Sequence, residues 1–202
     1  MTMLETTGLT RVFGGVRAVS DVSFAVPEGQ WLGIIGPNGA GKTTLFNLLT
    51  GFMQPTTGSV SFNGAPLRGL APYKVVNSGM ARTFQLCRPF VGMNLLENVL
   101  VACMSPRAHQ DHDKEERARH LLEQVGLGGR GAEPVETLPY GDLRRLEIAR
   151  ALATRPDLLL LDEPFAGLGS SEIEPLAQLI KKLHREENLT ILLIEHKLRE
   201  FM

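Results

Sequence analysis

The segment GPNGAGKT, residues 36–43, constrains the fold of this chain more than any other feature. It matches the pattern G-x-x-x-x-G-K-[ST], in which glycines let consecutive backbone N–H groups turn towards one anion. An apolar run, WLGIIG at 31–36, precedes it, and a run with helical spacing, TTLFNLLTG at 43–51, follows it. This order predicts a parallel-sheet strand covered on both faces, then a phosphate-binding loop, then a helix whose N-terminus faces the phosphate.

The same loop supplies the first candidate site residues. Lys42 is expected to reach the β- and γ-phosphates of a nucleotide, and the Thr43 hydroxyl to bind Mg²⁺. A plain glycine turn between a strand and a helix is the alternative, but the flanking elements favour nucleotide binding. The residues expected to contact the nucleotide here are Gly36, Pro37, Asn38, Gly39, Ala40, Gly41, Lys42, Thr43 and Thr44.

A second apolar run, DLLLLDEP at 157–164, ends in two adjacent carboxylates. Asp162 would lie at the carboxyl end of a buried strand, where open α/β sheets bind their ligands, and would hold Mg²⁺ through water. Glu163 is placed to orient or deprotonate an attacking water. Taken alone, such acids are better explained as the cap of a strand end. Together with the loop at 36–43 they indicate nucleotide hydrolysis.

Composition excludes several other classes. The 202 residues carry a formal net charge of −1, which argues against a nucleic-acid binder with a basic surface. No apolar run approaches the roughly 18 residues of a membrane span, and the N-terminus lacks the basic and apolar regions of a signal peptide. Cys87 and Cys103 form no C-x-x-C pair and suit a reducing compartment. A cytoplasmic protein is therefore expected.

The remaining patterns predict a discontinuous α/β core. VSFAV at 22–26 predicts a short strand, and Asn63-Gly64 predicts a hairpin turn. Residues 86–150 are mostly helical in spacing, and LTILLIEH at 189–196 is another buried strand. The expected fold class is α/β, a P-loop NTPase core with a mainly parallel sheet, a small antiparallel β subdomain and a helical subdomain.

The order of these motifs resembles the ATP-binding-cassette (ABC) ATPases, the nucleotide-binding subunits of membrane transporters. That family places a P-loop, then a glutamine (here in ARTFQ, 81–85), a helical arm, and a signature helix (here YGDLRRLEIARAL, 140–152) directly before the acidic strand. No N-K-x-D motif is present, which disfavours a GTPase. The wording of the motifs, with Tyr140 where most members have glycine, is similar to the ATPases of branched-chain amino-acid importers, the LivG-like group.

The resemblance implies roles for further residues. Gln85 is expected to touch Mg²⁺ or the attacking water, and His196 to hydrogen-bond the γ-phosphate. Phe13 stands where the family has an aromatic ring against adenine, with a core phenylalanine as the alternative. Tyr140 and Gly141 are expected to face the ATP of a second subunit. Catalysis is thus assigned to Lys42, Gln85, Glu163 and His196, and metal binding to Thr43, Gln85 and Asp162.

The resemblance also implies a function, which is hydrolysis of ATP with Mg²⁺ to power uptake of branched-chain or related amino acids. Expected partners are transmembrane permease subunits docked near residues 86–95, a second ABC ATPase in a homodimer or heterodimer, and indirectly a periplasmic or extracellular binding protein. No nucleic-acid partner is expected. The location would be peripheral, on the cytoplasmic face of the plasma (inner) membrane. The alternatives are a degenerate or regulatory subunit with weak hydrolysis, a soluble non-transport ABC ATPase, and a metabolic P-loop kinase.

Three positions depart from the family pattern. Pro139 replaces the serine whose hydroxyl would face the partner's ATP, and Asp142 replaces the usual glutamine. The negative charge of Asp142 would repel phosphate unless Arg144 or Arg145 offsets it. Gly169 replaces the polar residue of the family's D-loop. These departures predict intact ATP binding and a weakened signature.

The expected domain organisation is one ABC ATPase domain, residues 1–202, that is short at its C-terminus relative to the family. Within it, residues 1–85 and 151–202 would form the nucleotide-binding core with its antiparallel β part. Residues 86–150 would form the helical subdomain that carries the signature helix.

Overall fold

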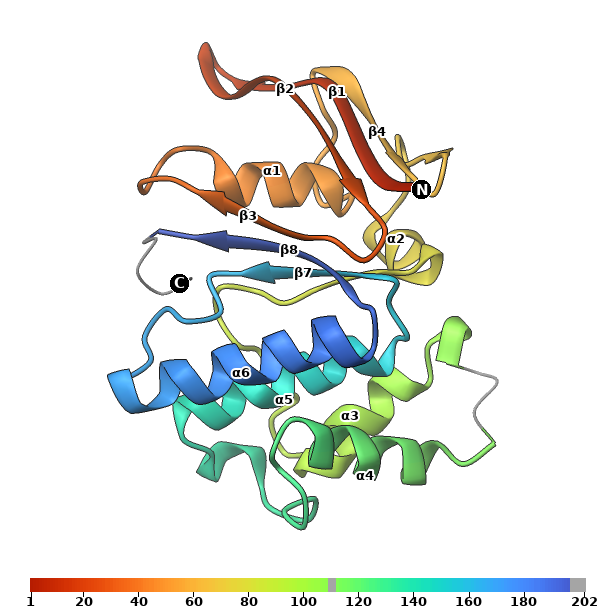
Figure 1. Ribbon diagram of the computed structural model, residues 1–202, viewed down its shortest axis with the longest axis vertical. Helices are drawn as coiled ribbons and strands as arrows, with labels where there is room; N and C mark the ends of the chain where they lie inside the picture. The colour runs from red at the N-terminus through yellow and green to blue at the C-terminus, as the bar shows by residue number, and fades with distance from the viewer. Residues whose placement is uncertain (109–111, 197–202) are drawn as a thin grey trace.

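The computed structural model describes residues 1–108 and 112–196, and its elements stack in layers (Figure 1). Two four-stranded sheets are separated by α1, and the remaining long helices lie beyond the second sheet. The elements in chain order are β1 Thr2–Phe13, β2 Val16–Pro27, β3 Trp31–Ile35, α1 Lys42–Leu49, β4 Thr57–Phe62, β5 Ala65–Pro66, α2 Pro72–Ser78, β6 Met80–Arg82, α3 Leu95–Cys103, α4 Lys114–Gln124, α5 Tyr140–Ala153, β7 Leu158–Asp162, α6 Ser170–Glu186 and β8 Thr190–Glu195, with 3-10 turns at Pro106–Ala108 and Val135–Thr137.

The second sheet is parallel, with strand order β3-β8-β7-β6. All five side chains of β7 are buried, because successive residues of a strand point to opposite faces and both faces are covered. Leu158 and Leu160 pack towards α1, whereas Leu159 and Leu161 pack towards α5 and α6. The sheet therefore divides the hydrophobic core into two clusters, and its central strands end together at one edge.

The expectation for the strand at 31–36 is wrong in one respect. It forms β3 as predicted, but within the described residues β3 is an edge strand that pairs only with β8. Its side chains are only partly buried, and Ile35 is 41% exposed. A continuous apolar run indicates a strand, but it does not distinguish a central strand from an edge strand.

The first sheet is antiparallel, with strand order β2-β1-β4-β5. The predicted Asn63-Gly64 turn joins β4 to β5, and both residues have positive φ (49° and 76°), as a tight hairpin turn requires. The expected short strand at 22–26 is part of the much longer β2. Its partner β1 is equally long, and the two are joined at Gly14-Gly15.

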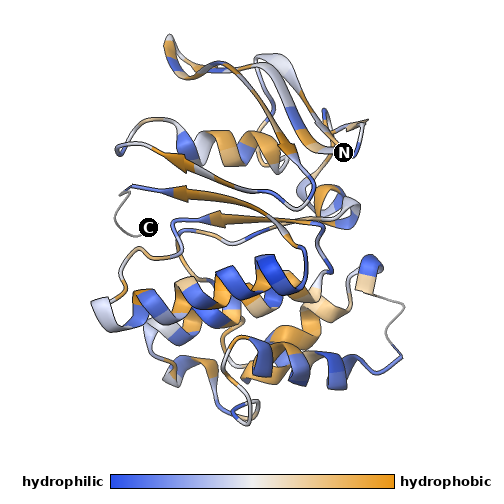
Figure 2. Ribbon diagram, viewed as in Figure 1, coloured by the Kyte–Doolittle hydropathy of each residue, from blue (hydrophilic) through white to orange (hydrophobic). Residues whose placement is uncertain are grey.

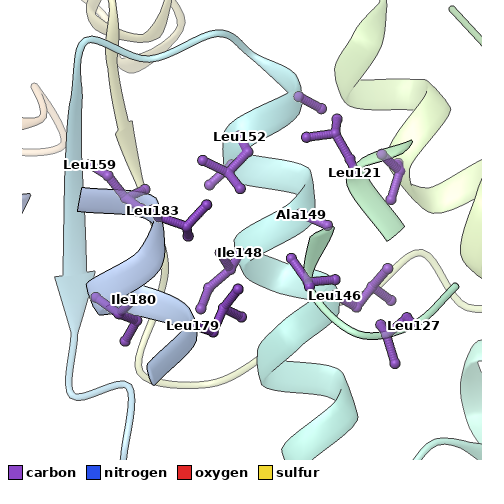
Figure 3. Packing of buried hydrophobic residues seen from close by; sticks show 14 of the residues in the cluster. Leu121, Leu127, Leu146, Ile148, Ala149, Leu152, Leu159, Leu179, Ile180 and Leu183 are labelled. Carbon is purple, nitrogen blue, oxygen red and sulfur yellow. The ribbon is translucent and has the colours of Figure 1, made fainter. Parts of the chain in front are cut away.

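Helices α5 and α6 cover the other face of the parallel sheet, and α3 and α4 pack beneath α5 (Figure 1). Most of the contacts labelled in Figure 3 come from leucine, isoleucine and alanine side chains of these helices and of β7, and Leu127 joins them from the loop after α4. In Figure 2, α6 shows the alternation of apolar and polar residues of a helix with one buried face. The predicted fold class is confirmed. No helix among residues 1–108 and 112–196 is both long and apolar enough to cross a membrane.

Candidate functional site

The loop at residues 36–41 lies between the carboxyl end of β3 and the start of α1. Gly39 and Gly41 have φ of 81° and 86°, a conformation that L side chains rarely adopt. A Cβ on Gly41 would also lie 2.0 Å from the carbonyl oxygen of Ala18, so the β1–β2 hairpin packs directly against this loop. Glycine at 41 is therefore required twice, by the backbone angle and by the space. Thr43 and Thr44 occupy the first turn of α1.

Lys42 is held across the mouth of this loop. Its ammonium donates to the carbonyl oxygens of Gly36 (2.6 Å) and Pro37 (3.0 Å), and it lies 3.1 Å from Nδ1 of His196. These partners anchor the cation beside the loop, where a bound phosphate group would need a positive charge. Lys42 is almost fully buried, so its charge acts in a poorly solvated environment.

The carboxylate of Asp162 is fully buried at the end of β7. Its Oδ2 accepts a hydrogen bond from Arg82 (2.7 Å), whereas its Oδ1 has no hydrogen-bond partner among the described residues. Asp162 and Thr43 line one cavity of about 710 Å³, together with Gln85. A buried carboxylate oxygen without a partner is costly, and a hydrated cation would satisfy it. The donor set therefore fits Mg²⁺.

No group of three or more histidine, cysteine, aspartate or glutamate side chains is clustered for a metal in the described part of the chain. Magnesium commonly binds through one or two protein oxygens plus substrate phosphates. A site of Asp162 and Thr43 would hold the ion as a nucleotide complex rather than by itself.

Glu163 lies between two of the other residues assigned to catalysis, Gln85 and His196. Its Oε2 accepts a hydrogen bond from Gln85 (3.0 Å), and its Oε1 lies 2.5 Å from Nε2 of His196. Because the ammonium of Lys42 can only donate, Nδ1 of His196 accepts, and Nε2 carries the proton shared with Glu163. Glu163 has a φ of 50°, a conformation that costs a non-glycine residue about 1–2 kcal/mol. The four residues assigned to catalysis therefore form one series of contacts, in the order Gln85, Glu163, His196 and Lys42.

The start of α5 is tied to the segment that carries Gln85. The buried guanidinium of Arg144 donates to the carbonyl oxygens of Phe84 (2.8 Å) and Gln85 (2.7 Å) and to the hydroxyl of Tyr140 (2.7 Å). The carboxylate of Glu147 accepts from the backbone N–H of Phe84. One turn of α5 therefore fixes the backbone beside Gln85 and the orientation of Tyr140.

Neither Arg144 nor Arg145, the two residues named as able to offset Asp142, pairs with it among the described contacts. The carboxylate of Asp142 pairs with Arg130 (2.6 Å), which also binds Glu133, and these acceptors, Glu133 first, raise the pKa of Arg130. Arg144 is occupied as described above, and Arg145 donates to the carbonyl oxygen of Val125. The guanidinium of Arg130, in the segment between α4 and α5, thus neutralises Asp142. The sequence could not indicate this pairing.

Pro139 is the N-cap residue of α5 and makes no side-chain cap, so the helix N-terminus depends on backbone groups alone. Gly141 lies against the carboxylate of Glu172 from α6. Gly167 packs against the ring of Tyr140, so the segment between β7 and α6 contacts the start of α5 in the same chain. Gly169 is the N-cap residue of α6, and its N–H donates to Glu172.

Phe13 lies at the end of β1, beside the Gly14-Gly15 turn, and is 40% exposed. The alternative that Phe13 is a core residue is therefore wrong. The guanidinium of Arg11 stacks on its ring at 4.7 Å, which leaves the other face for an aromatic base. The adenine role of Phe13 stays a prediction.

The sequence did not indicate the roles of two residues that contact the site. Arg82 binds the carboxylate of Asp162, and Arg144 holds the backbone of Gln85. A signal existed for Arg82, because it is the only charged residue of β6. Arg144 had no comparable signal, since charged residues are common in helices.

Cys87 offers a test of the packing near Gln85. Burial, and then the charge of Glu147, raise the pKa of the Cys87 thiol to about 12. At pH 8 its reactive thiolate should be about a thousandfold scarcer than in an ordinary cysteine, so alkylation by iodoacetamide should be correspondingly slow. Replacing Glu147 with glutamine should speed the reaction. Cys103 is fully buried and should not compete. Mass spectrometry measures the rate at which Cys87 is alkylated. A rate equal to that of a free thiol would contradict this packing.

Comparison with known proteins places this geometry in context. Residues 19–166 match the ABC transporter family. The chain is 45% identical over 214 aligned residues to BraF of Pseudomonas aeruginosa, a high-affinity branched-chain amino acid transport ATP-binding protein. It is 42% identical to LivG of Salmonella typhimurium, which has the same description. Both alignments cover 99% of this chain and 84% of the relative.

The fold is also similar to that of solved ATP-binding cassettes. A dimeric ATP-binding cassette in a post-hydrolysis state, bound to ADP and Pi, superposes with a TM-score of 0.85 at 27% identity. The alignment covers 98% of this chain and 90% of that one.

Proposed function

This chain belongs to the ABC transporter family, and we propose that it is the ATPase subunit of an importer for branched-chain or related amino acids. The observation that carries the proposal is the placement of Glu163 between Gln85 and His196, with Lys42 next in the same chain of contacts. The cargo follows from relatives that are more than 40% identical over nearly the whole chain.

In the proposed reaction, the backbone amides of the loop at 36–41 and the Lys42 ammonium hold the phosphates of ATP. Glu163 accepts a proton from the attacking water, which Gln85 orients from the other side. His196, already a donor through Nε2, hydrogen-bonds the γ-phosphate. Asp162 and Thr43 would hold Mg²⁺, which when bound neutralises phosphate charge.

We propose that the transport partner docks on the apolar side of the 710 Å³ cavity. Its apolar lining, called the docking groove below, includes the exposed side chains of Phe52, Phe84, Leu86, Phe90 and Val101. Exposed apolar patches of this kind mark protein contacts. The proposed occupant is a cytoplasmic segment of the permease, which would hold this subunit on the cytoplasmic face of the membrane. An extracytoplasmic binding protein would act only indirectly.

The transport proposal is tested by expressing the chain with the permease genes next to it in the genome. We expect the subunit to copurify with the permease from detergent-solubilised membranes and the complex to hydrolyse ATP. A Phe90→Glu variant should lose the permease but keep ATP binding, because Phe90 is not part of the phosphate-binding loop at residues 36–43. Wild-type protein that fails to associate with the permease would contradict the transport role and leave a soluble ATPase.

We also propose that two such cassettes enclose ATP between them, as a dimer, with the start of α5 facing the partner's nucleotide. Pro139 weakens that contact because it supplies neither a hydroxyl nor an N–H. A Pro139→Ser variant restores the donor at a backbone position that suits an N-cap serine (φ −56°, ψ 156°). ATP turnover should rise by up to about a hundredfold. An unchanged turnover number would show that the signature is not impaired.

A further inference from the structure

Arg82 lies where the docking groove meets the carboxylate of Asp162, and both residues line the same cavity. Its side chain is only 6% exposed, so the guanidinium is largely removed from water. A buried cation of this kind needs partners for its charge and its N–H groups. Its partners are of two kinds, polar groups and aromatic rings.

The polar partners come from α1, its C-cap residue and β7. Nη2 donates to Oδ2 of Asp162 (2.7 Å), and Nη1 donates to Oδ1 of Asn47 (2.7 Å) and to Oγ1 of Thr50 (3.3 Å). Asn47 lies in α1, and Thr50 is the C-cap residue of that helix. The planar fork of one arginine therefore connects the helix after the phosphate-binding loop to the strand that ends in the metal-site carboxylate.

The apolar partners are three phenylalanine rings. The centroids of Phe46, Phe52 and Phe84 lie 5.5, 6.0 and 5.1 Å from the guanidinium carbon, within the range of cation–π attraction. Phe52 and Phe84 also contact each other edge to face at 5.7 Å. Phe46 is buried, but Phe52 and Phe84 are 54% and 40% exposed in the docking groove.

We propose that Arg82 is a positioning residue for Mg²⁺ binding. By taking Oδ2 of Asp162 it fixes the carboxylate and leaves the buried, unpartnered Oδ1 for the hydrated ion. The rings of Phe52 and Phe84 hold the guanidinium in that place. The inference rests on the proposed function, and it means that one side chain separates a partner in the docking groove from the metal-site carboxylate.

The test compares ATP affinity, measured by calorimetric titration, in Mg²⁺ and in EDTA. Arg82→Met removes the fork, and Arg82→Lys keeps the charge but cannot bind Asp162 and Asn47 with the same planar geometry. Affinity in EDTA should stay within about twofold of the parent protein. The gain from Mg²⁺ is the ratio of the ATP affinity in Mg²⁺ to that in EDTA. This ratio should fall about tenfold in Arg82→Met and less in Arg82→Lys.

A second pair of variants tests the aromatic contact without touching a polar partner. Phe52→Ser removes an exposed ring from the guanidinium, so the gain from Mg²⁺ should fall by about threefold. Tyr73→Ser removes an aromatic ring that is 64% exposed and lies outside the residues that line the cavity, and it should change nothing. Thermal unfolding of each variant identifies the folded proteins to be compared.

The outcomes separate the inference from the proposed function. A parent protein that binds no nucleotide overturns the proposed function and the inference with it. A parent that binds ATP more tightly with Mg²⁺, together with folded Arg82 variants that show the same gain, overturns the inference alone. If the Arg82 variants lose ATP affinity equally in Mg²⁺ and in EDTA, Arg82 has a merely structural role. If the gain from Mg²⁺ is larger in the variants than in the parent, Arg82 competes with the metal for Asp162. Either result also overturns the inference.

Discussion

Replacing Glu163 with glutamine is expected to lower the ATP turnover number about a thousandfold while ATP affinity stays within a few-fold of the parent. Glutamine is nearly isosteric, and its side chain can still hydrogen-bond Gln85 and His196, so the local packing should survive. What is lost is the carboxylate that accepts the proton of the attacking water, a role typically worth 10²–10⁴ in rate. Steady-state ATPase assays and nucleotide titration together measure both quantities.

The same variant also tests the dimer. With hydrolysis blocked, ATP should remain bound, and gel filtration should show an ATP-dependent dimer. Glu174→Gln is the matched control, because Glu174 is an exposed carboxylate on α6 that pairs only with the exposed Gln178 among the described residues. It should leave turnover unchanged. Normal turnover by the Glu163→Gln protein would remove Glu163 from the reaction.

Replacing Gly41 with alanine is expected to reduce ATP affinity about a hundredfold or more. The new methyl group would lie 2.0 Å from the carbonyl oxygen of Ala18, a contact with rigid backbone that cannot be relieved by a side-chain rotation. The phosphate-binding loop and the β1–β2 hairpin would have to separate, and the aligned amides would lose their common direction. Losing two charge-assisted hydrogen bonds already accounts for a change of this size.

Gly14→Ala is the matched control for this prediction. Gly14 also has a positive φ (52°), but a Cβ there has nothing within 4 Å, so the variant carries the backbone strain without the collision. It should lower the melting temperature by a few degrees, because the strain costs about 1–2 kcal/mol, and leave ATP affinity unchanged. Equal ATP affinities for the two variants would mean that the close approach at Ala18 does not matter.

The parts of the site that the sequence predicted are those whose physics is local. A glycine-rich loop between a strand and a helix already implies turned amides and a helix N-terminus at one point. An apolar strand that ends in Asp162 and Glu163 places both acids at the ligand-binding edge of the sheet. The strands at 158–162 and 190–195 were therefore predictable from four or five apolar residues each, since both faces of the sheet are covered.

The parts that it did not predict depend on partners far apart in the chain. Arg82 and Asp162 are separated by 80 residues, and no periodicity connects them. The pairing of Asp142 with Arg130 needs the loop after α4 to return to the start of α5. Edge and central strands of one parallel sheet have similar apolar sequences, so the exposure of β3 depends on which strands pair with it and not on its own residues.

The central claim is that residues 36–43 hold a triphosphate beside the carboxylates that end β7. It is tested most directly by calorimetric titration of the purified protein with ATP in the presence of Mg²⁺. We predict saturable binding of one ATP per chain, tighter in Mg²⁺ than in EDTA and strongly weakened by Gly41→Ala. No saturable binding by the parent protein, or parent-like binding by the Gly41→Ala variant, would contradict the account.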